Sequence, residues 1–260
     1  MRRLADIALP LAVAGLLLGF WEWKVAHDAI PAYVLPAPSA ILRALADNFS
    51  TLMESLGTTL LVTLLAFLSA SVAALGLAVL FSESRAAERS LYPYAVMLQV
   101  TPVVAIAPFI LLWVGYDRVT AAETLIAAIV AFFPVLSNTT LGLRSADFNL
   151  IDLMRLYGAS RWQILWRVRL PTALPFLLSG MKTAGGLALI GSVVAEFVAG
   201  SGAATGLAWR IIEATNRLEI ASAFAALTLL VVIGLVIFYA LAGVEYLLLR
   251  RWHESALTRP

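Results

Sequence analysis

The most informative part of the chain is residues 55–82, which read SLGTTLLVTLLAFLSASVAALGLAVLFS. No charged side chain interrupts this window. A helix that crosses a membrane needs roughly 20 apolar residues, because the hydrocarbon core is about 30 Å thick. Residues 55–82 exceed that length and therefore predict a helix that crosses a lipid bilayer.

The composition of the whole chain agrees with a protein that is solvated mainly by lipid. Of its 260 residues, 62% are hydrophobic and only 13% are charged, whereas soluble domains have about 45–50% and about 25%. The absence of cysteine excludes a disulfide scaffold. A net charge of +2 is too small to indicate a nucleic-acid partner. The only histidines, His27 and His253, fall near expected span ends, so we expect no metal site and no cofactor.

Charge-free windows elsewhere in the chain extend this prediction to an all-α membrane protein, because a lipid environment requires the backbone polar groups to bond within helices. Six transmembrane helices are predicted, at residues 7–25, 57–81, 90–114, 121–143, 173–198 and 221–249, in a single domain over residues 1–260. The first span could instead be a signal peptide, since Arg2 and Arg3 precede it. The segment Trp21-Glu22-Trp23-Lys24 favours a retained helix with an interfacial anchor.

Basic residues predict the orientation, because lysine and arginine gather on the cytoplasmic side of a membrane protein. With both termini in the cytoplasm, the inner segments hold Arg2, Arg3, Arg85, Arg89, Arg144, Arg155, Arg161, Arg167, Arg169, Arg250, Arg251 and Arg259. The outer segments then hold Lys24, Arg43, Arg118, Arg210 and Arg217. In the first outer segment, residues 39–56 predict an amphipathic helix at the membrane surface, with Ser39 as its cap.

The inner segment 144–171 is too rich in arginine to cross the membrane. Residues 149–157 have helical character and end at Gly158, a residue type that closes helices in the left-handed conformation. Ser160-Arg161-Trp162-Gln163 fits a capping box that begins a second helix. The residues alone fit two interpretations of this helix–turn–helix elbow, an element that docks a partner protein and a simple interfacial loop.

The same segment has the spacing of a known motif. Asp152-Leu-Met is followed after three residues by Gly158, and after nine more by Val168-Arg-Leu-Pro171. This pattern resembles the EAA loop of bacterial ABC-importer permeases, in which Glu-Ala-Ala precedes the glycine and Ile-x-Leu-Pro ends the motif. Three further stretches resemble the permease group that imports nitrate, sulfonates, taurine, bicarbonate and pyrimidine vitamin precursors: Leu35–Ser39, Gln99–Gly115 and Val194–Phe197.

The resemblance implies a type I ABC-importer permease in the bacterial inner membrane. In such a transporter, a homodimer of six-helix subunits binds two ABC ATPase subunits and receives solute from a substrate-binding protein. The elbow would couple the permease to the ATPase through Asp152, Arg155, Gly158, Ala159, Ser160 and Arg161. The chain itself is not expected to be an enzyme. Gly180-Met181-Lys182-Thr183 lacks the glycine that a phosphate-binding loop needs before its lysine.

Polar residues within the spans are candidates for the translocation path, because a carboxylate that faces lipid is unfavourable. Glu196 is expected in the outer half of the membrane, where it would either line or gate the path or bind a structural partner. Gln99, Thr101 and Pro102 interrupt the third span, and such interruptions often line cavities. Three glycines before Glu196 would permit close helix packing or a bend: Gly185, Gly186 and Gly191.

These features predict the permease subunit of an ATP-driven importer for a small solute, similar to a sulfonate, taurine, nitrate or a pyrimidine precursor. The alternative is an ATP-independent secondary transporter that uses Glu196. That class usually relies on several intramembrane charges or inverted repeats. An intramembrane enzyme would need a nucleophile–base or metal constellation, for which the sequence offers few residues.

Overall fold

The computed structural model describes residues 2–200 and 205–250, and within these ranges the backbone forms helices and turns without strands. Five of the described helices are long and apolar enough to cross a membrane, and a bent helix pair gives a sixth candidate. This confirms an all-α membrane protein with about six spans. His253, Arg251 and Arg259 lie outside the described residues.

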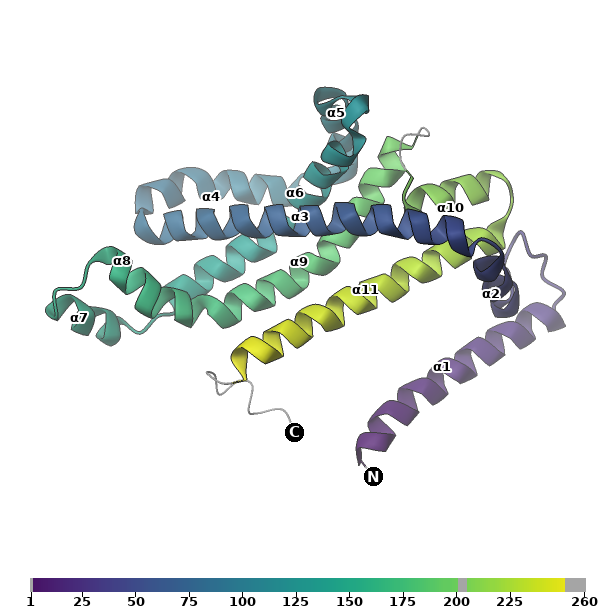
Figure 1. Ribbon diagram of the computed structural model, residues 1–260, viewed down its shortest axis with the longest axis horizontal. Coiled ribbons are helices and arrows are strands. Elements are labelled where there is room, and N and C mark those ends of the chain that lie inside the picture. Colours follow the sequence, from purple (N-terminus) through teal and green to yellow (C-terminus); the bar gives the residue numbers. More distant parts are fainter. Residues whose placement is uncertain (1, 201–204, 251–260) are drawn as a thin grey trace. The chain divides into compact units, whose positions relative to one another are not determined.

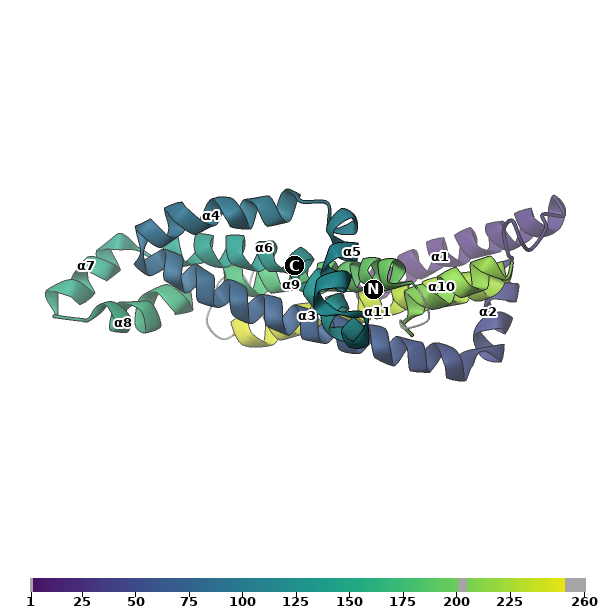
Figure 2. The same ribbon diagram turned by 90° about the horizontal axis from the view of Figure 1, so that it is seen from above.

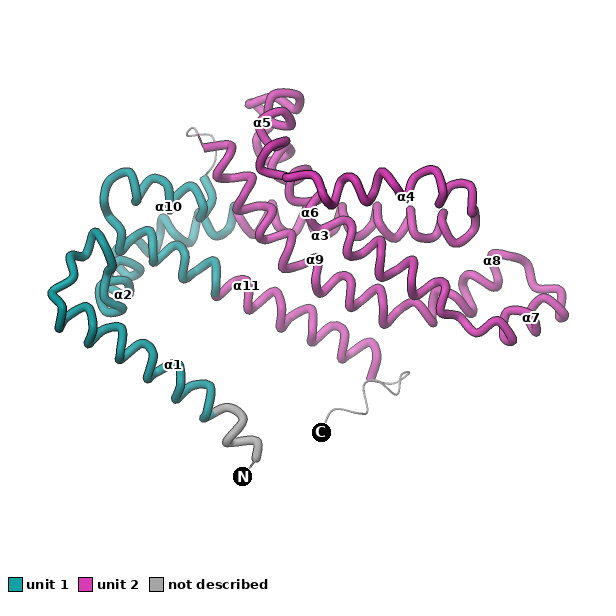
Figure 3. The backbone as a smooth tube through the Cα atoms, turned by 180° about the vertical axis from the view of Figure 1, so that it is seen from behind, with its two compact units in different colours: residues 1–58, 205–231 teal, residues 59–204, 232–260 magenta. Residues whose placement is uncertain are grey.

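The chain forms two compact units, which Figure 3 shows in different colours. Unit 1 comprises residues 1–58 and 205–231. It contains α1 (Arg2–His27), α2 (Pro38–Asp47), α10 (Leu207–Asn216) and the first turns of α3 (Phe49–Glu83) and α11 (Ile220–Leu249). Unit 2 comprises residues 59–204 and 232–260 and holds the other helices.

In unit 1, a carboxylate joins α1 to α2. Glu22 accepts hydrogen bonds from the backbone N–H of Ser39 at 3.0 Å and from its hydroxyl at 2.8 Å. Ser39 is therefore not the cap that the sequence predicted. Ala37 is the N-cap residue and Pro38 follows it in the first turn. An N–H group at this position has no partner within the helix, so a proline here removes no hydrogen bond.

The expected amphipathic helix over residues 39–56 is two helices in the structure. α2 ends at Asp47, Asn48 forms its C-cap, and α3 begins at Phe49. The Asn48 side-chain amide donates to the Ala44 carbonyl at 3.0 Å. Asparagine competes for backbone groups in this way and favours helix ends, so the chain breaks here although the apolar spacing continues.

Unit 2 is a bundle in which α3, α4 (Arg85–Val100), α6 (Val119–Arg144) and α9 (Leu170–Ala199) lie side by side (Figures 1 and 2). Its core consists largely of alanines with a few larger side chains such as Phe81 and Leu136. Small residues let membrane helices approach closely. A Cβ atom built on Gly191 would lie 2.7 Å from the Cα atom of Ala127 in α6.

α9 is a continuous helix from Leu170 to Ala199, through Gly185, Gly186 and Gly191. A Cβ on Gly185 would meet a methyl group of Leu241. Gly186 differs, because nothing lies within 4 Å of such a Cβ atom. Close contact with a backbone atom therefore explains Gly191, and α9 stays helical through all three glycines.

The third expected span, residues 90–114, is a broken one. α4 and α5 (Val103–Val114) meet at an angle of 104°. Thr101 is extended and Pro102 is the N-cap residue of α5. The residue before a proline avoids the helical conformation, which explains why the chain turns at this pair. η1 (Tyr116–Arg118) then leads into α6.

The fifth expected span, residues 173–198, begins earlier than the sequence indicated. A continuous helical run extends from Arg161 to Ala199 through α8 (Arg161–Ile164), a π-helical turn η2 (Leu165–Arg169) and α9. In a regular helix, the ring of Pro171 would clash with the carbonyl of residue 167. Residue 167 lies within the wider π turn, so the helix continues through the proline.

Candidate coupling elbow and path residues

The elbow begins with a short helix that is capped at both ends. The Asp147 carboxylate accepts a hydrogen bond from the Asn149 N–H at 2.8 Å, and α7 (Phe148–Leu156) follows. After Tyr157, Gly158 has a φ of +75°. The Gly158 N–H donates to the Arg155 carbonyl at 2.9 Å, and the Ala159 N–H donates to the Met154 carbonyl at 3.0 Å. These bonds satisfy the last carbonyls of α7 and fix the direction in which the chain leaves it.

The second arm of the elbow starts with the predicted capping box, which the structure confirms. The Ser160 hydroxyl accepts from the Gln163 N–H at 3.3 Å, and the Gln163 side chain accepts from the Ser160 N–H at 2.7 Å. Together these bonds satisfy two otherwise unpaired donors at the start of α8. Only the four residues 157–160 therefore separate two helices with well-defined ends.

A small hydrophobic core holds the two arms of the elbow together. Ile151 of α7 packs with Ile164, Val168 and Ala146, all of which are buried, and Met154 and Ala159 lie against them. In contrast, large apolar side chains of the elbow that lie outside this core are exposed. Leu156 and Tyr157 have exposed fractions of 85% and 83%, and Trp162 and Trp166 of 64% and 68%. A group of exposed apolar side chains is typical of a contact surface.

Charged groups on the elbow are available to a partner. Asp152 and Arg155 form an ion pair at 3.0 Å, with both side chains more than 60% exposed. Exposed pairs of this type contribute about 0–1 kcal/mol, so the pair contributes little to the stability of the elbow. The six residues predicted for coupling all lie on this one element: Asp152, Arg155, Gly158, Ala159, Ser160 and Arg161.

The residues predicted for the translocation path fall into two environments. Gln99 and Pro102 are exposed at the break between α4 and α5, and the Thr101 hydroxyl donates to the Met97 carbonyl at 2.7 Å. Glu196 is fully buried in unit 2 and accepts a hydrogen bond from the Thr59 hydroxyl of α3 at 2.7 Å. One turn earlier on α9, the Ser192 and Thr63 hydroxyls lie 2.9 Å apart.

Glu123 is a buried carboxylate that sequence reasoning overlooked. It is 2% exposed near the start of α6, and its Oε1 atom has no hydrogen-bond partner among the described residues. The sequence does place Glu123 directly before the charge-free window 124–143. A carboxylate at the edge of such a window is also typical of a surface residue, so the pattern alone does not indicate burial.

A helical membrane bundle with an exposed elbow between two of its spans is the arrangement that the sequence predicted for a transport permease. Residues 66–253 match the family described as the binding-protein-dependent transport system inner membrane component. The match covers most of the chain, which therefore belongs to this family. It is an ABC-importer permease of the group that includes sulfonate and taurine permeases.

Relatives match nearly the whole chain. The riboflavin transport system permease protein RibX of Chloroflexus aurantiacus is 37% identical over 96% of this chain and 91% of its own length. A probable ABC transporter permease of Haemophilus influenzae is 34% identical over 89% of this chain and 93% of its length. The formylaminopyrimidine transport permease protein ThiX of Halalkalibacterium halodurans is 32% identical over 96% of this chain and 98% of its own length.

A solved structure shows the same fold. A chain of an amino acid ABC transporter crystallised with histidines matches 80% of this chain and 96% of its own length with a TM-score of 0.64, at 18% sequence identity. The fold is therefore that of a type I importer permease. In this family the permease is not an enzyme, since separate subunits hydrolyse ATP. The permease lies in a membrane, and its partners are ATPase and substrate-binding proteins.

Proposed function

We propose that the chain forms the translocation path of an ATP-driven importer, as a homodimer, and that the elbow of α7 and α8 docks one ATPase subunit on each copy. The observation that carries the docking assignment is the local geometry of the elbow. Its turn is fixed by Gly158 and the Ser160–Gln163 capping box. The large apolar side chains outside the core of the elbow are exposed. A partner that contacts the elbow differently in two conformations would shift the balance between them, and the helices joined to the elbow would shift with it.

The connection to the membrane helices supports this role. α8 continues through η2 into α9 without a break in the helical run. Arg169 at the end of η2 donates to the Ser82 carbonyl at 3.0 Å and pairs with Glu83 at 3.1 Å. A displacement of the elbow would therefore act directly on α9 and on the end of α3.

The docking assignment is tested by co-purification. The tagged full-length chain is purified from its host in mild detergent, and the ATPase that accompanies it is quantified. We expect the double variant Tyr157→Ala/Trp162→Ala to lose most of the ATPase, because it removes exposed apolar area from the elbow without touching its core. The matched control is Trp113→Ala/Tyr116→Ala, which removes exposed aromatic rings elsewhere. Equal ATPase recovery from both variants would contradict the docking assignment.

We further propose a small heterocyclic solute as the substrate. The relatives named for riboflavin and formylaminopyrimidine are 37% and 32% identical over 96% of this chain. Two relatives named for aliphatic sulfonates are 30% and 32% identical over 86% and 62% of it, and a taurine permease of Escherichia coli is 26% identical. The charge distribution supports a substrate without strong negative charge, since Lys182 in α9 is paired with Glu245 at 2.5 Å. Competition of unlabelled riboflavin, a pyrimidine and taurine against each labelled solute would decide between these classes.

The proposed homodimer follows from the position of the path residues. Gln99 and Pro102 are exposed on a single chain, so a path that they line needs a second surface opposite them, and a second copy supplies it. For Glu196 the observations favour a structural role, because a solute path is wet and this carboxylate is fully buried against Thr59. Its place in the path stays a prediction. Uptake that persists after ATP depletion would instead support the secondary transporter.

A further inference from the structure

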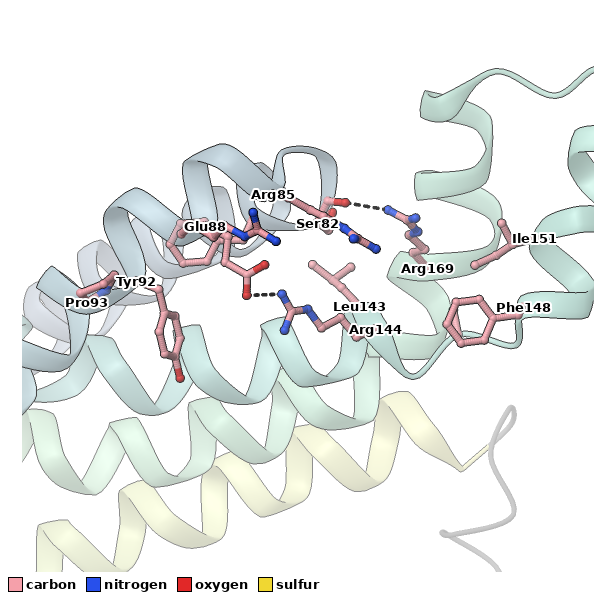
Figure 4. A pocket seen from close by; sticks show the side chains of 13 residues that line it. Ser82, Arg85, Glu88, Tyr92, Pro93, Leu143, Arg144, Phe148, Ile151 and Arg169 are labelled. Atoms are coloured by element: carbon pink, nitrogen blue, oxygen red, sulfur yellow. Dashed lines mark hydrogen bonds and ion pairs between the residues drawn. The ribbon is translucent and has the colours of Figure 1, made fainter.

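A pocket of about 720 Å³ lies in unit 2 beside the elbow, at the ends of α3, α4 and α6 (Figure 4). Pockets for small ligands have volumes of about 300–1,000 Å³. The lining is divided between basic side chains and apolar ones. Its basic residues are Arg85, Arg89, Arg144 and Arg169, and its apolar or aromatic residues include Phe81, Tyr92, Pro93, Leu143, Phe148 and Ile151.

The charges of this pocket do not balance. Arg144 forms an ion pair with Glu88 (Figure 4), and Arg169 forms one with Glu83. Within residues 2–200 and 205–250, no carboxylate forms an ion pair with Arg85 or Arg89, which lie on the first turns of α4. The positive end of the α4 helix dipole adds to their charge. The pocket therefore has two guanidinium groups available for an anion.

The geometry points to a phosphate group as that anion. A planar guanidinium binds two oxygens of a phosphate at once, and arginine is preferred where such recognition matters. Arg85 and Arg89 lie four residues apart on one helix, so their side chains project from the same face. Arg144 enters the pocket from α6 and supplies a third donor group.

The apolar wall decides which phosphate compound fits. Tyr92 and Pro93 of α4 line the pocket about one turn beyond Arg89, and α4 belongs to a membrane-spanning candidate. A soluble phosphate gains nothing from such a wall, whereas a phospholipid has acyl chains to place there. We propose that this pocket binds the headgroup phosphate of an anionic phospholipid.

A lipid in this position would contact both α4 and the elbow. The pocket is lined by α4 on one side and by Phe148 and Ile151 of α7 on the other, and Ile151 belongs to the small core of the elbow. A headgroup bound to Arg85 and Arg89 would thus brace the start of the elbow. The proposal rests on the membrane location of the chain and is independent of the assigned solute and of ATPase docking.

The test is native mass spectrometry of the full-length chain, purified in mild detergent after reconstitution into phosphatidylcholine vesicles with and without phosphatidylglycerol. We expect the native chain to retain phosphatidylglycerol in preference to phosphatidylcholine. The variant Arg85→Gln/Arg89→Gln should retain roughly tenfold less, because each basic side chain contributes to binding of an anionic lipid. The control variant Arg43→Gln/Arg118→Gln removes the same charge elsewhere and should retain as much as the native chain.

Further variants and a competition measurement distinguish a lipid phosphate from other anions. Arg85→Lys/Arg89→Lys keeps the charge but loses the planar fork, so it should retain more lipid than the glutamine variant and less than the native chain. Equal loss of lipid from the control variant would overturn the proposal. So would displacement of all bound lipid by inorganic phosphate, which identifies a soluble anion as the ligand. A third overturning result is a glutamine variant that keeps its lipid but no longer co-purifies with the ATPase, because the pocket would then bind an acidic segment of that partner.

Discussion

Gly158 is the residue on which the turn of the elbow depends. Its φ of +75° is left-handed, and no atom lies within 4 Å of a Cβ built there. A side chain at this position would therefore meet backbone strain rather than a steric clash. We expect Gly158→Val to destabilise the turn by about 1–2 kcal/mol, with normal membrane insertion but greater protease sensitivity of residues 144–171 and weaker ATPase co-purification. Gly158→Asn should behave almost normally, because asparagine tolerates this conformation. Full ATPase recovery from the valine variant would show that the turn does not set the docking geometry.

Glu123 gives a second prediction at the level of one residue. Its Oε1 atom is buried without a hydrogen-bond partner among the described residues. Glu123→Gln keeps the shape, removes a charge and supplies a donor, so we expect it to stabilise the protein by about 1 kcal/mol. The melting temperature in detergent should rise by about 2–4 °C. Glu54→Gln, an exposed change on α3, is the control and should leave the melting temperature unchanged. A lower melting temperature for Glu123→Gln would mean that this carboxylate has a partner that requires its charge.

At the level of elements, the contact between α6 and α9 depends on the absence of a side chain at Gly191. A Cβ there would approach the Ala127 Cα atom to 2.7 Å, and overpacking of this kind costs about 1–3 kcal/mol. We expect Gly191→Val to lower the melting temperature, whereas Gly186→Val on the same helix has open space and should not. The pair controls for the helix propensity of valine, because both positions lie within α9. Equal destabilisation by the two variants would show that propensity, rather than packing, determines the effect.

The same elements show what local sequence patterns predict. The capping box at Ser160 and the glycine turn before it depend on residues within a few positions of each other, so the sequence alone identified them. The break at Thr101–Pro102 was also indicated, since proline restricts its neighbour. The bond from Ser39 to Glu22 could not be foreseen, because it joins residues 17 positions apart and replaces a cap that local pattern favours. The arginine pocket was missed for the same reason, since its residues come from several helices that only the fold brings together.

At the scale of the whole molecule, the orientation of the chain determines whether the elbow meets ATP-hydrolysing partners at all. The excess of arginine in the segments on one side predicts that residues 144–171 are cytoplasmic. The native sequence contains no cysteine, so single cysteines report on orientation without background. Asp117→Cys and Asp152→Cys replace side chains that are 77% and 68% exposed, and one crossing, α6, separates them.

A membrane-impermeant maleimide applied to spheroplasts should label the cysteine at position 117 at once. The cysteine at position 152 should react only after the membrane is permeabilised, because the elbow then becomes accessible from outside. Labelling of both in permeabilised membranes is the control for reactivity. The opposite pattern would place the elbow outside the cell, where no ATPase could dock, and would leave the lipid pocket as the only role proposed for that end of unit 2. The expected pattern would place the elbow, the arginine pocket and the ATPase on the same side, as coupling through α9 requires.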